Sequence, residues 1–222
     1  MNLEEWVIVF DLDDTIISER EYQLSGITYI EKTISELYNT NFEGLIHSAK
    51  DKGIDDIWEW TCKKLNLSLD TKVTIKWLYR LHKPRIRLRD DINLLIKELE
   101  FKKAKIAIIS DGRSITQRLK VQSIGLERFP LLISEDFNSV KPNSKRFNQI
   151  ERIWPNKKYV YVADNPAKDF ICPKSLNWFC IGANWITDRI YLSNKKLEPQ
   201  PDKWLNDPHE VISTIENLRN SN

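Results

Sequence analysis

The sequence predicts an α/β fold built on a central parallel β-sheet with helices on both faces. Three apolar runs, 6–10, 106–109 and 159–162, are short, rich in β-branched or aromatic residues, and bounded by turn residues. Such runs are typical of strands buried on both faces of a sheet. Helical patterns alternate with the later runs, which favours parallel strands joined by right-handed crossovers. The predicted core is therefore a doubly wound, Rossmann-like sheet of about five or six strands.

The segment 18–85 interrupts this alternation and predicts an inserted helical subdomain. Its apolar residues recur at spacings of about three and four, which is typical of amphipathic helices. Helices are expected over about 19–39, 42–51, 54–66 and 70–82. We therefore expect an α/β core formed by 1–17 and 86–222, and a helical cap, 18–85, positioned over the functional edge of that core.

After the insert the sequence returns to alternating helices and strands. The expected elements are a helix over 90–102, a strand over 106–109, a helix over 114–124 closed by Gly125, a strand over 131–134, a helix ending at 153, a strand over 159–163, a short helix around 167–175, a strand over 178–181 and a final helix over about 208–219. The proline-containing segment 195–207 is expected to wrap over the surface.

Composition narrows the class of protein. The chain has 222 residues, enough to bury a substantial core, and its formal net charge is only +2. No overall basic field results, so no nucleic-acid partner is expected. The sequence has no apolar run of about 18 residues and no secretory signal, which predicts a cytoplasmic protein without a membrane span. Cys62, Cys172 and Cys180 are widely spaced and are expected to be reduced thiols.

Two acidic residues directly follow the first predicted strand. Asp11 and Asp13 lie two positions apart, so both side chains can reach one centre at the end of that strand. A carboxylate can attack phosphorus to form a covalent intermediate, and a second carboxyl group can protonate the leaving oxygen. Taken alone, the segment 11–15 is equally suited to an Asx turn at the end of a strand.

The second predicted strand of the core ends in Ser110, followed by Asp111 and Gly112. A hydroxyl group and the N–H groups at the start of a helix can hold a phosphate. Further along, Pro142 keeps Lys141 out of helical geometry. A fixed ammonium group can neutralise charge on a phosphoryl group during its transfer.

A last acidic pair, Asp164 and Asp169, follows the strand predicted over 159–163. Carboxylate oxygens are the ligands that Mg²⁺ takes from proteins, usually one or two together with water and substrate phosphate. The carboxyl ends of parallel strands meet at one edge of the sheet. The sequence therefore predicts that these two residues join Asp11 at that edge.

In this order the segments resemble the motifs of the haloacid dehalogenase superfamily of phosphohydrolases, and the insert resembles the helical C1 cap of its first subfamily. The resemblance implies that Asp11 is the nucleophile and Asp13 the general acid and base. It also implies that Ser110 and Lys141 bind the phosphoryl group. The remaining candidates for substrate binding are Thr15, Asp111 and Gly112.

The resemblance also implies a magnesium cofactor. Its ligands would be Asp11, Asp164 and the backbone carbonyl of Asp13, with Asp169 directly behind them, holding a metal-bound water or orienting Lys141. The sequence departs from the pattern at position 163, where alanine stands in place of the usual glycine. Alanine is small, so only a slight adjustment of the loop is expected.

The expected function is a magnesium-dependent phosphomonoesterase that acts on a small phosphorylated metabolite through an aspartyl-phosphate. Asp13 favours this activity, since true dehalogenases of the superfamily lack that acid and need no metal. The segment 164–170 resembles members encoded with surface-polysaccharide biosynthesis, which favours a sugar phosphate as substrate. The alternatives are a phosphomutase, a nucleoside 5′-monophosphate phosphatase and, from another class, a non-catalytic regulatory or binding member.

Overall fold

The computed structural model describes residues 2–188 and 198–220. By its internal contacts the chain divides into two compact units, which are described separately. Unit 1 comprises Met1–Glu19 and Arg87–Asn222, and unit 2 comprises Arg20–Ile86. No helix in the described part of the chain is both long and apolar enough to cross a membrane.

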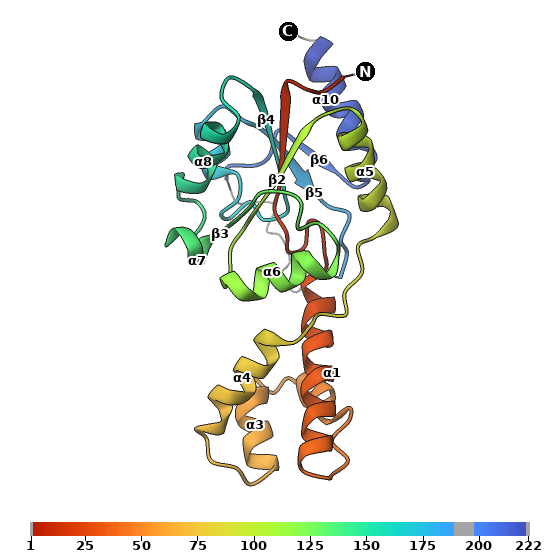
Figure 1. The fold of residues 1–222 in the computed structure, drawn as a ribbon, viewed down its shortest axis with the longest axis vertical. Helices are drawn as coiled ribbons and strands as arrows, with labels where there is room; N and C mark the ends of the chain where they lie inside the picture. Colours follow the sequence, from red (N-terminus) through yellow and green to blue (C-terminus); the bar gives the residue numbers. More distant parts are fainter. Residues whose placement is uncertain (1, 189–197, 221–222) are drawn as a thin grey trace. The chain divides into compact units, whose positions relative to one another are not determined.

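Unit 1 is organised around one parallel sheet, in which the described residues form six strands (Figure 1). The strands are β1 (Trp6–Phe10), β2 (Lys105–Ser110), β3 (Leu131–Ile133), β4 (Lys158–Ala163), β5 (Phe179–Ala183) and β6 (Lys203–Leu205). Their order across the sheet is β3-β2-β1-β4-β5-β6. The prediction of a doubly wound parallel sheet is confirmed, and the first strand lies between the strands that lead to Ser110 and Asp164.

Helices lie on both faces of this sheet. Figure 1 shows α7 and α8 on one side and α5 and α10 on the other. The helices of unit 1 are α5 (Asp90–Phe101), α6 (Ser114–Ser123), α7 (Ser134–Phe137), α8 (Lys145–Ile153), α9 (Ile171–Ser175) and α10 (Glu210–Asn220). Helix α6 ends where predicted, because Gly125 adopts a φ of +71° just beyond its C-cap.

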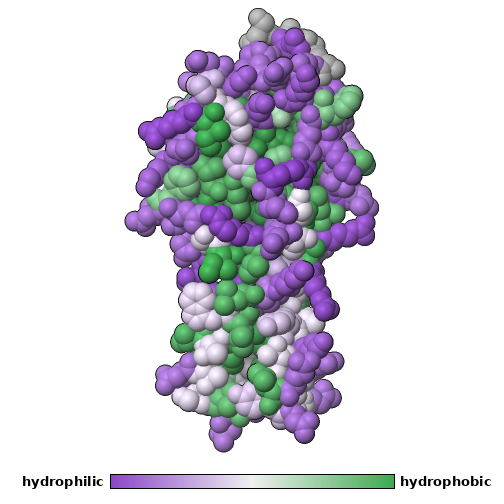
Figure 2. Space-filling model, viewed as in Figure 1, coloured by the Kyte–Doolittle hydropathy of each residue, from purple (hydrophilic) through white to green (hydrophobic). Residues whose placement is uncertain are grey.

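The core between the sheet and α8 consists of alternate strand residues, since successive side chains of a strand point to opposite faces. Val7 and Val9 of β1 and Tyr161 of β4 belong to one buried cluster with Phe147 and Ile150 of α8. On the face drawn in Figure 2, hydrophobic side chains gather in the middle of unit 1 and hydrophilic ones surround them. The three cysteines are free and buried.

The register of the strands fixes where the functional edge lies. Phe10 pairs with Ile108 of β2 and with Val162 of β4. The next residue, Asp11, extends this pairing by donating its N–H to the Val162 carbonyl at 2.9 Å. Parallel strands in this register end together, so the residues that follow β1, β2 and β4 emerge at one edge of the sheet.

Unit 2 is entirely helical within the described residues. Its helices are α1 (Glu19–Leu37), which begins at the last residue of the first segment of unit 1, α2 (Leu45–Asp51), α3 (Ile57–Lys64) and α4 (Thr71–Leu81). They surround a buried cluster that includes Ile27, Ile30 and Cys62. Helix α3 is capped by Asp56, whose Oδ1 accepts the Glu59 N–H at 3.0 Å. Asp70 stands at the corresponding position of α4 without a side-chain cap hydrogen bond.

Two elements were not predicted from the sequence, the short helix α7 and strand β6. The segment 195–207 was expected to wrap over the surface, but 203–205 form strand β6 beside β5. Residues 195–197 lie outside the described residues. The pairing depends on Gly182, because a Cβ at this position would lie 2.2 Å from Cε3 of Trp204. A three-residue strand shows no alternation of its own, and only the packing of the Trp204 ring against β5 distinguishes it from a loop.

Candidate active site

The site lies at the edge of unit 1 where β1, β2 and β4 end. Asp11 follows β1, Ser110 is the last residue of β2, and Asp164 follows β4. Asp11, Asp164 and Asp169 each offer a carboxylate oxygen, and these three atoms lie within 4.8 Å of one another. All three residues are buried. The structure thus brings together the acidic residues that the sequence predicted as a group.

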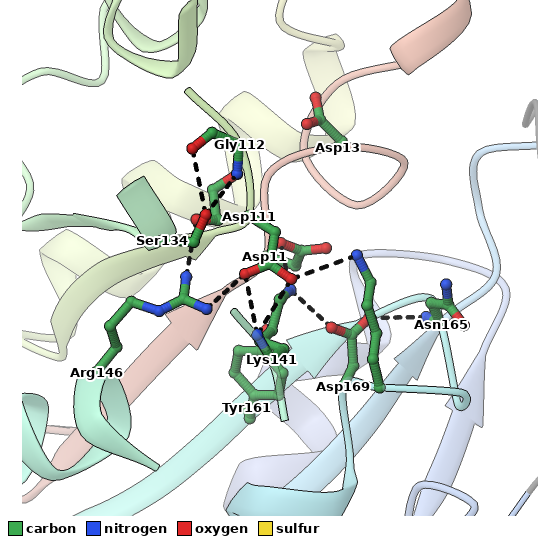
Figure 3. A network of polar contacts seen from close by, with 12 residues as sticks. Asp11, Asp13, Asp111, Gly112, Ser134, Lys141, Arg146, Tyr161, Asn165 and Asp169 are labelled. Atoms are coloured by element: carbon green, nitrogen blue, oxygen red, sulfur yellow. Dashed lines mark hydrogen bonds and ion pairs between the residues drawn. The ribbon is translucent and has the colours of Figure 1, made fainter. Parts of the chain in front are cut away.

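Lys141 is held at the centre of this group (Figure 3). Its Nζ lies 2.8 Å from Asp11 Oδ1, 2.6 Å from Asp169 Oδ1 and 3.1 Å from the hydroxyl of Tyr161. An ammonium group has three donors, and the three acceptors use all of them. The side chain has no exposed surface. Lys141 is therefore fixed in one orientation beside the predicted nucleophile.

The charges of the group depend on each other. Burial alone would lower the pKa of Lys141, but Asp11 and Asp169 outweigh it and hold that pKa well above its usual value. Burial raises the pKa of Asp11 to about 6, against the opposing effect of Lys141. A further cation beside Asp11 would favour its ionised form.

The donor set fits a magnesium ion. Mg²⁺ prefers oxygen ligands and is commonly bound by one or two carboxylates. Asp169 has both oxygens engaged by the protein, since Oδ1 faces Lys141 and Oδ2 accepts the Asn165 N–H at 3.0 Å. Asp11 and Asp164 are therefore better suited to direct ligation, and Asp169 to holding Lys141 in place. This division agrees with the one implied by the resemblance.

Ser110 has the environment expected of a phosphoryl-binding hydroxyl. The residue is 1% exposed, and its Oγ has no hydrogen-bond partner among the residues that the structure describes. Buried hydroxyl groups are normally paired, so an orphaned one in a site is explained by a ligand that supplies the missing partner. A phosphoryl oxygen is an acceptor of the required kind. The backbone carbonyl of Ser110 is held at 2.8 Å by Nη1 of Arg146.

Asp111 braces the loop that follows β2. Its carboxylate accepts the backbone N–H of Lys141 at 3.2 Å and pairs with Nη2 of Arg146 at 2.5 Å. Arg146 is completely buried in α8. The carboxylate of Asp111 thus joins the loop after β2 to Lys141 and to α8. That Asp111 binds substrate stays a prediction. Its observed contacts stabilise the fold around the site.

The backbone groups of Gly112 and Thr15 also contact other parts of the protein. The Gly112 N–H donates to Ser134 Oγ at 2.9 Å and is already occupied. Thr15 is fully buried, and its carbonyl accepts the indole N–H of Trp185 at 2.8 Å. These contacts hold the two loops in place. Their predicted contacts with substrate remain predictions.

Asp13 lies apart from the group around Lys141, and Figure 3 shows its carboxylate directed away from Asp11. Its Oδ1 is 2.7 Å from Nζ of Lys120, and its Oδ2 accepts from Nε2 of Gln117 at 3.1 Å. Lys120 also contacts Oε2 of Glu19 at 2.7 Å. Burial would raise the pKa of Asp13, but Lys120 holds it below the usual value. Burial and the charge of Asp13 raise the pKa of Glu19 to about 7.

Sequence reasoning missed four of the residues that organise this site. Lys120 and Gln117 are polar residues on the inner face of α6, and Arg146 occupies the inner face of α8 beside Phe147. Tyr161 of β4 is fully buried, so its hydroxyl requires a partner. A polar residue on a face that should be apolar was the available signal in each case.

The haloacid dehalogenase-like hydrolase family model matches residues 8–183. The chain belongs to this family. The resemblance predicted from the four motifs is therefore confirmed, whereas the C1 subtype of the cap stays a prediction. No curated protein matches the sequence of this HAD-like hydrolase.

Solved structures with the same fold include enzymes of several activities. The HAD-hydrolase YfnB from Bacillus subtilis, bound to magnesium, is 18% identical with a TM-score of 0.65, covering 94% of this chain and 97% of its own. A predicted phosphoglycolate phosphatase from Haemophilus somnus is 16% identical with a TM-score of 0.64, covering 94% and 97%. The 2-haloacid dehalogenase from Pseudomonas syringae is 14% identical with a TM-score of 0.64, covering 96% and 98%. These likenesses establish the fold, which serves both phosphatases and dehalogenases.

Proposed function

We propose that this HAD-like hydrolase is a magnesium-dependent phosphomonoesterase that acts through an aspartyl-phosphate on Asp11. The observation that carries the proposal is the separate placement of two acids, of which Asp11 is buried and Asp13 partly buried. Asp11 lies against Lys141, whereas Asp13 is held by Lys120 and Gln117. A phosphoryl transfer needs a nucleophile on one side of phosphorus and an acid at the leaving oxygen on the other.

In the first step a carboxylate oxygen of Asp11 forms a bond to phosphorus, and the bond from phosphorus to the leaving oxygen breaks. Asp13 gives its proton to that oxygen, and the negative charge of the bound phosphoryl group favours the protonated form of Asp13 against the effect of Lys120. In the second step Asp13 takes a proton from water, whose oxygen attacks phosphorus and releases phosphate from Asp11. The hydroxyl of Ser110 donates to a phosphoryl oxygen, and the fixed ammonium of Lys141 offsets the negative charge beside it.

Magnesium is supported as the cofactor by the three carboxylates at this edge of the sheet. Asp11 and Asp164 would hold the ion, and Asp169 would keep Lys141 in position. When bound, the ion supplies positive charge that offsets the phosphoryl oxygens and the nucleophile.

The substrate in this proposal is a small phosphorylated metabolite, with a sugar phosphate favoured by the segment 164–170. Unit 2 would act as the cap, because the chain enters it directly after the loop that carries Asp11 and Asp13. The whole of 20–86 lies between β1 and β2 in the sequence. Residues of this unit would then select the leaving group of the substrate.

The test is turnover of a panel of sugar phosphates, nucleoside monophosphates and phosphoglycolate by the purified enzyme, with and without Mg²⁺. We expect phosphate release only with the metal, and a trapped phosphoryl group on the peptide that contains Asp11. Asp11→Asn should abolish release and leave the fold intact. The matched control is Asp136→Asn, which removes a carboxylate of the surface pair with Arg118.

Two results would contradict the proposal. Unchanged rates in Asp11→Asn would exclude the covalent mechanism, and absence of turnover across the panel would favour a non-catalytic member of the family. A labelled sugar bisphosphate separates a phosphatase from a phosphomutase, since a mutase keeps the label on the sugar.

A further inference from the structure

A buried lysine on helix α6 contacts the acid that the proposed reaction needs. Lys120 is 2% exposed, and its Nζ lies 2.7 Å from Asp13 Oδ1 and 2.7 Å from Glu19 Oε2. Gln117, one helical turn earlier on the same face, donates its Nε2 to Asp13 Oδ2 at 3.1 Å. Both oxygens of the Asp13 carboxylate are therefore held from one helix.

This arrangement is costly for the fold, and folding alone does not explain it. Taking the ammonium group of Lys120 out of water is costly before its pairing with the partly exposed carboxylates compensates, and apolar residues of similar volume often stabilise as well or better. The inner face of α6 also holds Val121, which is 1% exposed. An all-apolar face would bury α6 equally well, but it could not orient a carboxylate.

The same face of α6 is hydrogen-bonded to the loop after β2. Nε2 of Gln117 also donates to the Asp111 carbonyl at 3.2 Å. Gly112 makes this approach possible, because a Cβ at that position would lie 2.3 Å from Nε2 of Gln117. The group that holds Asp13 is thus fixed to the loop that carries Ser110 and its unpartnered hydroxyl.

We propose that Lys120 and Gln117 are positioning residues that hold the Asp13 carboxyl group for its proton transfers with the leaving oxygen. This inference rests on the proposed phosphomonoesterase function. In an in-line displacement the leaving oxygen lies on the side of phosphorus opposite to the nucleophile. An acid that serves it must be kept away from Asp11, and a side chain restrained at both oxygens loses the other orientations that would make it ineffective.

A positioning role predicts a dependence on the leaving group. A phenol that is itself a strong acid departs without much help, whereas a weakly acidic alcohol or phenol needs its oxygen protonated as the bond to phosphorus breaks. Displacing Asp13 should therefore affect poor leaving groups far more than good ones. A lysine that only supports the fold would affect both alike.

The experiment compares kcat/KM for phenyl phosphate and for 4-nitrophenyl phosphate, because kcat/KM reports the step in which the leaving group departs. Lys120→Met is expected to lose at least about 10-fold more on phenyl phosphate than on 4-nitrophenyl phosphate, a part of the ~10²–10⁴-fold that general acid–base catalysis contributes. Asp13→Asn removes the acid itself, so its difference between the two substrates is the largest that Lys120→Met can reach. Lys102→Met is the matched control, since Lys102 is a partly buried lysine paired with Glu216 at the end of α5.

Gln117→Leu keeps the ion pair and should show a smaller difference in the same direction, so it replaces Lys120→Met if that variant does not fold. Equal losses of kcat/KM on both substrates in folded variants, with Asp13→Asn still selective for the poor leaving group, would overturn this inference. The proposed function would stand in that case. A gain on phenyl phosphate would also overturn this inference, because the contact would then hold Asp13 in a resting position. If the wild-type enzyme hydrolyses neither these esters nor any member of the metabolite panel, the proposed function fails and this inference fails with it.

Discussion

The hydroxyl group of Tyr161 lies 3.1 Å from Nζ of Lys141, in the buried second half of strand β4. This contact supplies the third acceptor of the ammonium group, after Asp11 and Asp169. It also gives the buried hydroxyl the partner that it needs. The strand that leads to Asp164 therefore helps to orient the cation beside Asp11.

Tyr161→Phe tests this contact. One donor of Lys141 then lacks an acceptor, so we expect the unfolding free energy to fall by about 1 kcal/mol and kcat to fall by about 10-fold or less. Denaturant unfolding and steady-state kinetics measure the two effects. Tyr159→Phe is the control on the same strand, because its hydroxyl bonds to the Trp154 carbonyl. Equal kcat in both variants would mean that Tyr161 does not orient Lys141.

Gly112→Ala tests the approach of Gln117 to the loop after β2. Gly112 has a φ of +152°, and a Cβ there would collide with Nε2 of Gln117. We expect a loss of about 1–3 kcal/mol in unfolding free energy from the backbone strain, and a selective loss of kcat/KM on poor leaving groups. Gly125→Ala is the control, since it has a positive φ with nothing within 4 Å of the added Cβ. The same substrate selectivity in Gly125→Ala would refute the role of the collision.

The affinity for Mg²⁺ should depend on pH through Asp11. Burial raises the pKa of Asp11 to about 6, and only the ionised carboxylate binds a cation. Affinity should therefore fall by up to about 10-fold for each pH unit below about 6, measured by calorimetry. Without metal, the unfolding free energy depends on pH in the opposite direction. Between 3.8 and about 6 the folded state holds a proton that the unfolded chain has released, so the unfolding free energy falls as pH rises.

Asp11→Asn is the control for this prediction, because it removes the titrating group and should flatten the dependence. A wild-type affinity that stays constant between about pH 5 and about pH 7 would show that Asp11 is not a ligand.

Asp56→Ala tests the cap of helix α3 in unit 2. Asp56 accepts the Glu59 N–H, and its hydrogen bond to Lys72 leads the influences that lower its pKa. Its loss should reduce the unfolding free energy by about 1 kcal/mol, measured in denaturant. Asp70→Ala is the matched control at the start of α4, where no cap hydrogen bond forms. A larger effect at Asp70 would contradict the assignment of the caps.

The sequence predicted those parts of the site that the sheet itself positions. Asp11, Ser110 and Asp164 follow strands whose apolar runs are unmistakable, and parallel pairing then places them at one edge. Lys120 and Arg146 were not predicted, because each is a long side chain on a helix. Its direction depends on how that helix packs, and local periodicity does not encode it. Strand β6 was missed for a similar reason, since its pairing depends on Trp204 lying over Gly182.

The central position of β1 has a consequence for the folding of the chain. Val7 pairs with Lys105 on one side and with Tyr159 on the other, so neither neighbouring strand exists until the ribosome has passed the insert. Pairing across such sequence separations is slow, and an apolar strand with open edges is prone to aggregation until its neighbouring strands have paired with it. We therefore expect the yield of folded protein during synthesis to depend on how early Trp6–Phe10 is shielded, by transient contacts or by a chaperone.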